Sequence, residues 1–385
     1  MTVCNCDLSS CTWSFLFKKY GVEHMYPKLL IDLEKLDHNI HTLVQKMRSR
    51  SLSITAITKL YDADSQIVQL FENIPEIDYF GDSRIENLKA YQHTKKKKIL
   101  TRIPMHSETA DVVKYADISF NSEISTIRLL DGHAAEQGKT HEIVLLIDVG
   151  DLREGFYDED ELMTAIREVT TLKHTKLIGL GVSVMCYGGV IPDETNLGKL
   201  VTISEKVKQE FGIELPMITG GNSSSLYLLE NDLGLTLPQG INNLRIGDAF
   251  ATGETSFGRK FPDMHGDVFT LEAQIVEMKE KPSYPIGQIG VDAFGKIPEF
   301  EDKGLRIKGI LAVGRQDITP DGLYPEDARL KILGASSDHL IIDFTDSEGD
   351  YQVGCIIKFR LHYGAVLQAF TSKYVTKEYI EISGE

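Results

Sequence analysis

Cysteine is scarce in this chain, and negative charge exceeds positive charge. Only 5 of the 385 residues are cysteine, and they fall at Cys4, Cys6, Cys11, Cys186 and Cys355. An odd number with this uneven spacing shows no disulfide framework and favours a reducing cytoplasm. The formal net charge of -16 argues against nucleic acid as a main partner, because a phosphate backbone attracts basic surfaces.

The sequence also lacks membrane and secretion signals. The apolar segment TWSFLF is too short to span a bilayer, and it has neither a basic stretch before it nor a small-residue cleavage site after it. We therefore expect no membrane partner and no signal peptide. The CNCDLSSC cluster has no second pair of ligands to complete a four-ligand zinc site, so we predict no metal.

The length and the overall composition are those of a large globular enzyme. A chain of 385 residues exceeds the usual size of one domain, so two domains are expected. A hydrophobic content of 42% and a charged content of 25% are ordinary for a soluble protein.

Short apolar runs alternate with amphipathic helical stretches over about 200 residues. The first run after residue 50 is SITAITK, and seven more follow, near residues 80, 101, 119, 146, 180, 219 and 246. Eight strand-then-helix repeats are typical of a (β/α)8 barrel, with a doubly wound sheet as the alternative. Beyond residue 265 the residue pattern changes to β-rich segments in which side-chain character alternates from residue to residue, separated by Gly, Asp and Pro turns. This pattern predicts an all-β domain.

These patterns predict three regions. Residues 1–24 are expected to be a disordered or appended tail, residues 25–262 the barrel, and residues 263–385 the C-terminal β domain. The strand 29–33, LLIDL, could join the β domain instead of the barrel.

Several predicted strands end in polar residues, at the edge where parallel α/β folds place their chemistry. Lys59 ends the first barrel strand. The seventh ends in GGNSSS, whose glycine amides and hydroxyls precede a predicted helix, and the eighth continues into LRIGD with Gly247. A turn with an N-cap is the simpler interpretation of GGNSSS alone. Together with a lysine at a strand end, it favours a phosphorylated cofactor held by a Schiff base.

Several longer motifs resemble the alanine racemase-type (fold type III) pyridoxal-phosphate enzymes, and among them the members that act on ornithine. The similarity runs from MYPKLLIDLEKL at Met25 almost to the end, and its most specific stretches are YFGDSRIENLK, KYADISFNSE, LLIDVGDLREG, CYGGVIP, GGNSSSLYLL, LRIGDAF, PIGQIGVDAFG and LGASSDHLIID. The resemblance implies an N-terminal barrel, a C-terminal β domain, pyridoxal 5'-phosphate as cofactor, and a homodimer whose active site is shared between subunits.

The resemblance also implies a role for each matching residue. Lys59 would be the Schiff-base lysine and the acid/base on one face of the cofactor. Arg245 would lie against the pyridine nitrogen, where a cationic guanidinium cannot accept a proton and so leaves that nitrogen unprotonated. A carboxylate there would indicate the related decarboxylases instead. Arg153 would lie near the cofactor's phenolic oxygen and the substrate carboxylate. The residues implied to hold the phosphate are Asn222, Ser223, Ser224, Ser225 and Gly247.

The sequence departs from the family pattern at two places. The tyrosine expected a few residues after the lysine is Ala63 here, with Tyr61 as a possible substitute. The stretch PSYPIGQIGVDAFG has no tyrosine where the family places its second catalytic base. Racemisation needs an acid/base on each face of Cα. Asp292 is the first candidate, followed by Tyr284 and Cys186.

The predicted reaction is the interconversion of L- and D-ornithine. A distal ammonium needs carboxylate partners, and Asp338 and Asp292 are the candidates, with Ser337 placed to bind the α-carboxylate. One methylene is worth only about 1–3 kcal/mol of discrimination, so a broader basic-amino-acid racemase acting on lysine or arginine is the alternative. A non-catalytic pyridoxal-phosphate carrier is the other alternative, although carriers consist of the barrel alone.

Overall fold

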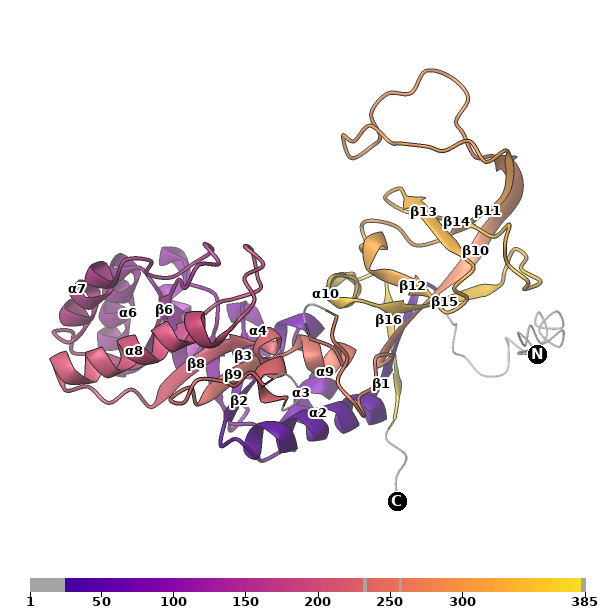
Figure 1. Ribbon diagram of the computed structural model, residues 1–385. Coiled ribbons are helices and arrows are strands. Elements are labelled where there is room, and N and C mark those ends of the chain that lie inside the picture. Colours follow the sequence, from indigo (N-terminus) through magenta and orange to yellow (C-terminus); the bar gives the residue numbers. More distant parts are fainter. Residues whose placement is uncertain (1–24, 231–233, 256–257, 382–385) are drawn as a thin grey trace. The chain divides into compact units, whose positions relative to one another are not determined.

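The computed structural model describes residues 25–230, 234–255 and 258–381 (Figure 1). The predicted tail, residues 1–24, lies outside the described residues. The chain forms two compact units, each with its own strands and core. One is Lys35–Gly266, and the other joins the residues up to Glu34 to Asp267–Glu385.

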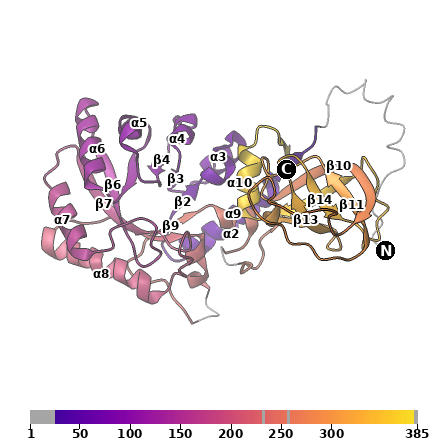
Figure 2. The same cartoon turned by 90° about the horizontal axis from the view of Figure 1, so that it is seen from above.

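Lys35–Gly266 contains a closed barrel of eight parallel strands, and Figure 2 shows its helices around the outside. The barrel closes where β2 pairs with β9, with Ala56 opposite Ile246. The strands are β2 (Ser53–Ile57), β3 (Tyr79–Asp82), β4 (Lys97–Leu100), β5 (Ile118–Asn121), β6 (His141–Ile147), β7 (Thr175–Val182), β8 (Met217–Asn222) and β9 (Asn243–Ile246). The predicted (β/α)8 barrel is therefore confirmed, and the doubly wound alternative is wrong because the sheet has no open edge.

One barrel helix precedes β2, and the others follow barrel strands in turn. They are α2 (Leu33–Arg48), α3 (Ser65–Glu72), α4 (Ile85–Ala90), α5 (Thr109–Tyr115), α6 (Ile124–Glu136), α7 (Glu159–Val169), α8 (Glu194–Phe211) and α9 (Asp248–Thr252). Short 3-10 helices, η2 (Lys59–Tyr61) and η4 (Ser223–Leu229), come directly after β2 and β8. The segment after GGN, expected to be an ordinary helix, is thus the tighter 3-10 form.

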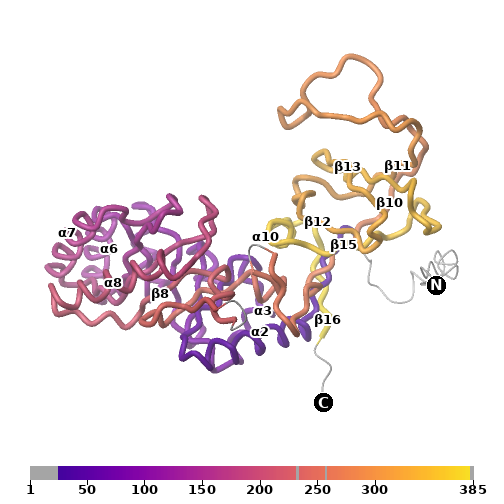
Figure 3. The backbone as a smooth tube through the Cα atoms, viewed as in Figure 1, coloured from indigo at the N-terminus to yellow at the C-terminus, as the bar shows by residue number. Residues whose placement is uncertain are grey.

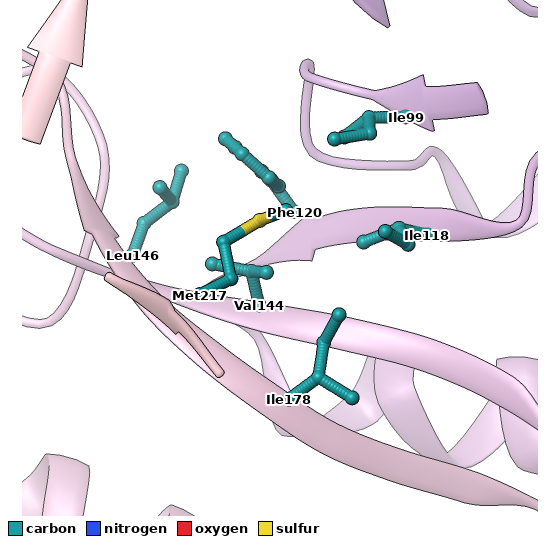
Figure 4. Packing of buried hydrophobic residues seen from close by; sticks show 7 residues of the cluster. All are labelled: Ile99, Ile118, Phe120, Val144, Leu146, Ile178 and Met217. Carbon is teal, nitrogen blue, oxygen red and sulfur yellow. The ribbon is translucent and has the colours of Figure 1, made fainter. Parts of the chain in front are cut away.

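Apolar strand residues fill the inside of the barrel. A cluster of Ile99, Ile118, Phe120, Val144, Leu146, Ile178 and Met217 packs there (Figure 4). Because these side chains occupy the interior, the barrel is a solid core and not a pore, and chemistry is confined to its ends.

The other unit is a predominantly antiparallel sheet with one helix, α10 (Tyr363–Thr371), which confirms the predicted C-terminal β domain. Its strands are β1 (Lys28–Asp32), β10 (Phe269–Pro282), β11 (Leu305–Leu311), β12 (Leu323–Pro325), β13 (Lys331–Ala335), β14 (Leu340–Asp343), β15 (Ile356–Leu361) and β16 (Thr376–Ile380). The early strand β1 pairs antiparallel with β10 and parallel with β16, so both ends of the described chain contribute to this sheet.

A long loop, residues 283–304, connects β10 to β11 and stands out from the sheet in Figure 3. It carries exposed apolar side chains, among which Ile286 is 92% exposed and Ile297 is 74% exposed. In the part of the chain that the structure describes, no helix is both long and apolar enough to cross a bilayer.

Candidate active site

Lys59 lies at the carboxyl end of β2. The strand residues before it, Ile54, Ala56 and Ile57, are buried in the barrel wall, so the lysine comes where the chain leaves the wall. The chain then turns sharply through Asp62 and Ala63, both in the left-handed region at φ 49° and 54°. Among the described residues the Lys59 ammonium has no hydrogen-bond or ion-pair partner. An unpaired amine at a barrel rim is available to bond a ligand.

A buried polar network fixes the residue before Lys59. The Thr58 hydroxyl donates to the Asp82 carboxylate over 2.6 Å and lies 2.8 Å from the Tyr91 hydroxyl. Burial raises the pKa of Asp82, although hydrogen bonds from Thr58, the Arg84 amide and Asn87 act in the opposite direction. The network ties the end of β2 to β3 and α4. The polar end of β3 was visible in the sequence, but its partners Thr58 and Tyr91 were not.

The GGNSSS segment forms a buried cradle at the end of β8. The Asn222 carboxamide oxygen accepts from the Ser224 amide over 2.8 Å, and the side-chain nitrogen donates to the Val184 carbonyl over 2.9 Å. The Ser225 hydroxyl donates to the Gly220 carbonyl over 2.7 Å, and the Ser223 hydroxyl accepts from the Ala249 amide over 3.2 Å. The serines Ser223, Ser224 and Ser225 are all buried.

The Ser224 hydroxyl differs from its two neighbours. It is fully buried and has no hydrogen-bond partner among the described residues. A buried hydroxyl without a partner carries a desolvation cost, which an anion with several acceptor oxygens would remove. Of the predicted phosphate ligands, Ser224 is the one whose buried hydroxyl has no partner at all among the described residues.

Gly247 brings the end of β9 against the end of β2. A Cβ atom at this position would lie 3.0 Å from the Ile57 Cβ, so a larger residue would push the two strand ends apart. The Gly247 carbonyl accepts a hydrogen bond from the Tyr61 hydroxyl over 3.0 Å. Tyr61, left open in the sequence as a substitute for the family tyrosine, therefore lies beside the predicted phosphate ligand Gly247.

Arg245 is buried in the barrel end of β9, with 7% exposure. Its guanidinium donates to the Thr219 hydroxyl over 2.9 Å and to the Val182 carbonyl over 2.8 Å, and it lies 5.2 Å from the centre of the Phe120 ring. Burial lowers its pKa to about 10, so it remains cationic at neutral pH. Two hydrogen bonds and a ring face hold the cation in place, and none of the described carboxylates is bonded to it.

Arg153 lies in the loop after β6 and forms an ion pair with its neighbour Glu154. Burial is the largest single influence and lowers the Arg153 pKa, but the hydrogen bond to Glu154 and the charges of Cys186, Glu154 and Asp151 together raise it. The loop is pinned to the loop after β7, because the Asp151 carboxylate accepts from the amides of Tyr187, Gly188 and Val190. Cys186, the third candidate for second base, lies in that second loop, exposed, with the Asn222 side chain donating to its sulfur over 3.4 Å.

Asp248 is a largely buried acid that is not among the site residues predicted from the sequence. It follows Gly247 at the start of α9, and its Oδ1 atom is buried without a hydrogen-bond partner among the described residues. Burial, with a smaller contribution from the charge of Glu254, raises its pKa to about 7, although Thr252 and nearby Lys59 act in the opposite direction. Its proximity to Lys59 follows from the barrel closure between β2 and β9, which no local sequence pattern reveals.

The candidate site residues fall into two groups. The carboxyl ends of β2, β6, β8 and β9 lie at one face of the barrel, which brings together Lys59, Arg153, Asn222, Ser223, Ser224, Ser225, Arg245 and Gly247. The remaining candidates, Tyr284, Asp292, Ser337 and Asp338, belong to the β-sheet unit.

In the β-sheet unit, Asp292 caps a turn of the 283–304 loop. Its Oδ1 atom accepts from the amides of Phe294 and Lys296, each over 2.9 Å, and these bonds lower its pKa. Tyr284 is 44% exposed and packs edge-on against Phe300.

Asp338 lies in the turn between β13 and β14, with its two carboxylate oxygens accepting from Gln316 and from the Ser337 hydroxyl, each over 2.6 Å. Arg315 connects this turn with the 283–304 loop. Its side chain donates to the Ala335 carbonyl over 3.1 Å and lies 5.1 Å from the centre of the Phe294 ring. The β-sheet unit therefore holds the candidates Asp292 and Asp338 around one arginine.

Comparison with known proteins places the chain in a family. Residues 31–249 match the family described as alanine racemase, N-terminal domain. The chain is 48% identical over 355 residues to the ornithine racemase of Acetoanaerobium sticklandii, which covers 92% of this chain and 99% of that protein. It is 36% identical over 358 residues to the lysine racemase of Thermotoga maritima, again covering 92% of this chain and 99% of the relative.

Solved structures show the same fold at low sequence identity. The alanine racemase from Bartonella henselae with covalently bound pyridoxal phosphate has a TM-score of 0.68 at 18% identity, and the match covers 92% of this chain and 99% of that one. The D-threonine aldolase from Filomicrobium marinum has a TM-score of 0.67 at 13% identity, with 90% and 88% covered. The resemblance stated from the sequence is thereby confirmed, and the chain belongs to the alanine racemase family as an amino-acid racemase.

Proposed function

We propose that the chain is a pyridoxal-phosphate-dependent racemase that interconverts L- and D-ornithine. The observation that carries the proposal is the barrel face, where the unpaired amine of Lys59 and the unpaired buried hydroxyl of Ser224 occur with the buried cation of Arg245. The 48% identity to the Acetoanaerobium ornithine racemase supports the choice of substrate.

The residues present fit pyridoxal phosphate. Lys59 would bond its aldehyde, Ser224 and the amides around Asn222 and Gly247 would hold its phosphate, and Arg245 would face its ring nitrogen. When bound, the cofactor delocalises the electron pair left at Cα when the proton departs. Arg245 stays protonated at neutral pH, so it can donate to the ring nitrogen but cannot take a proton from it.

Lys59 then acts as acid/base on one face of Cα, and a second group acts on the other face. We propose Asp292 for this second role, with Tyr284 and Cys186 as the alternatives. Asp292 is ionised at neutral pH and so can accept a proton, although the amide hydrogen bonds that lower its pKa also make it a weaker base. Both of its amide hydrogen bonds end on Oδ1, so the turn can hold the carboxylate through one oxygen while the other reacts.

The proposed assembly is a homodimer in which the β-sheet unit of one copy completes the barrel site of another. The exposed apolar side chains of the 283–304 loop support it, because Ile286, Val291 and Ile297 each expose most of an apolar side chain that a protein partner would cover. In this arrangement Asp292, Ser337 and Asp338 would face a partner's Lys59. We place the assembly in the cytoplasm.

The charges fit a basic amino acid. Arg153 supplies a cation for the α-carboxylate with help from Ser337, and Asp338 supplies a negative charge for the distal ammonium. The Gln316 and Ser337 hydrogen bonds hold Asp338 in one orientation before any substrate arrives. Lysine, one methylene longer, is the alternative substrate, and the identity to the Thermotoga lysine racemase favours testing it alongside.

Proton NMR in deuterium oxide tests the proposal. The purified protein, with pyridoxal phosphate and L-ornithine, should lose the Cα–H signal while chiral chromatography detects D-ornithine, and both should disappear in Lys59→Ala. L-lysine and L-alanine run in parallel would establish the order of preference. Cofactor binding without exchange of any basic amino acid would indicate the carrier alternative and refute the racemase.

A further inference from the structure

Glu154 is the one residue of the DLREG loop that contacts both a proposed substrate ligand and a barrel strand end. Its carboxylate accepts from the Arg153 guanidinium at both oxygens. The Oε1 atom also accepts from the Ser183 hydroxyl over 2.9 Å, directly after β7. Its side chain is 18% exposed, against 41% for Arg153. The acid therefore lies deeper than the cation that it holds.

The backbone of this loop is shaped to allow the contact. Adjacent side chains in an extended chain point in opposite directions, so a two-point contact between neighbours needs a backbone that departs from the extended form. Leu152 adopts φ 57° and Gly155 adopts φ 124°. A Cβ on Gly155 would come within 2.6 Å of the Asp148 backbone nitrogen, so only glycine fits there.

Other hydrogen bonds stabilise this turn and offset the strain of its left-handed backbone. The Asp148 carboxylate accepts from the amides of Gly150 and Leu152, over 2.8 and 3.1 Å. Asp151 is held by three amides of the loop after β7. A left-handed leucine costs of order 1 kcal/mol and persists only where its surroundings enforce it. The strained loop thus presents Arg153 and Glu154 together.

We propose that Glu154, anchored by Ser183, is a positioning residue that orients the Arg153 guanidinium to receive the α-carboxylate of the amino acid. The inference deepens the proposed function and rests on it. A bidentate carboxylate fixes the plane of a guanidinium and leaves its remaining N–H groups pointing in one direction. Glu154 also offsets the repulsion between Arg153 and Arg245, because its charge raises the Arg245 pKa whereas the charge of Arg153 lowers it.

The experiment compares two ligands that differ only in the carboxylate. Ornithine and 1,4-diaminobutane are titrated into the pyridoxal-phosphate-loaded protein, and binding is read from the change in the cofactor's visible absorbance. In Glu154→Gln the apparent affinity for ornithine should fall about tenfold, a loss of about 1.4 kcal/mol, while that for 1,4-diaminobutane stays within about twofold. Glu168→Gln, which breaks the Arg128–Glu168 pair between α6 and α7, is the matched control and should change neither affinity.

A second pair of variants tests whether Glu154 acts through Arg153. In an Arg153→Gln background, adding Glu154→Gln should produce no further loss of ornithine affinity. Ser183→Ala should produce a smaller loss of ornithine affinity, again without a loss for 1,4-diaminobutane. This variant tests the same inference if Glu154→Gln does not fold. Equal losses for both ligands, or additive losses in the double variant, would overturn the positioning role. A wild-type protein that binds neither ligand would refute the proposed function and this inference with it.

Discussion

The hydroxyl of Tyr61 donates a hydrogen bond to the carbonyl of Gly247 over 3.0 Å. This bond joins the segment that carries Lys59 to the segment that follows Arg245, where the first and last strands of the barrel meet. The proposed attachment point of the cofactor and part of its proposed phosphate site are therefore held in register by one side chain that is 1% exposed.

Tyr61→Phe removes this bond and leaves the ring in place. We expect the unfolding free energy of the apoprotein to fall by about 1 kcal/mol, as for a typical buried hydrogen bond, and pyridoxal phosphate to bind several-fold more weakly. Thermal unfolding and a fluorescence titration with the cofactor measure the two effects. Tyr351→Phe removes a phenolic hydroxyl that donates to Asp327 in the β-sheet unit, and it should lower stability without changing cofactor affinity. Unchanged cofactor binding in Tyr61→Phe would contradict the assignment.

Ser224→Ala should weaken cofactor binding without destabilising the apoprotein. The Ser224 hydroxyl is buried without a partner, so its removal should leave the apoprotein equally stable or more stable by about 1 kcal/mol. Pyridoxal phosphate should bind about tenfold more weakly, because a hydrogen bond to a charged group is lost.

The neighbouring hydroxyl offers the control for Ser224. The Ser225 hydroxyl is already bonded to the Gly220 carbonyl, so Ser225→Ala should destabilise the apoprotein. Calorimetry of each variant with and without cofactor measures both effects. A Ser224→Ala apoprotein that is clearly less stable than the wild type would show that the hydroxyl has a partner.

The contrast between these serines shows where sequence reasoning reaches its limit. The alternation of apolar runs and helical stretches predicted the barrel, and the position of Lys59 and of LRIGD at strand ends placed them at one face, because parallel strands all end there. GGNSSS could be recognised as a group, but its residues follow a 3-10 path on which successive hydroxyls meet different neighbours. Which serine stays unpaired depends on atoms from distant strands. The same holds for Tyr61, Asp248 and Glu154, whose partners are set by barrel closure and by turns on either side.

His141 should make the protein sensitive to acid. It is buried at the start of β6, 2.8 Å from the Ser119 hydroxyl, and burial lowers its pKa from 6.5 to about 4. Between pH 6.5 and 4 the unfolded chain therefore binds more protons at this residue than the folded chain. The stability that His141 contributes is complete above pH 6.5 and is lost as the pH falls toward 4, by at most about 3 kcal/mol.

A variant pair isolates the His141 contribution. Denaturant unfolding of His141→Gln, compared with the wild type from pH 7.5 to 4.5, should show a difference in stability that shrinks as the pH falls. For His93→Gln, a change at an exposed position on the barrel, the curve of stability against pH should run parallel to that of the wild type over the whole range. Parallel curves for His141→Gln would mean that the histidine titrates normally in the folded protein.

Asp292→Asn separates the turn-forming role of Asp292 from its proposed catalytic role. The asparagine carboxamide oxygen can still accept from the Phe294 and Lys296 amides, so the 283–304 loop should keep its shape. The proposed base on the second face is lost, whereas Lys59 remains. We therefore expect L-ornithine or D-ornithine, whichever presents its Cα–H to Lys59, to exchange that proton with deuterium, while inversion falls by at least about a hundredfold. Deuterium NMR combined with chiral chromatography measures both rates in one sample.

Retained inversion would exclude Asp292 and direct the search to Tyr284 and Cys186, whose Phe and Ser variants are tested in the same way. Loss of exchange from both enantiomers in Asp292→Asn would instead indicate that Asp292 binds the substrate, since a pure acid/base on one face cannot stop proton transfer on the other.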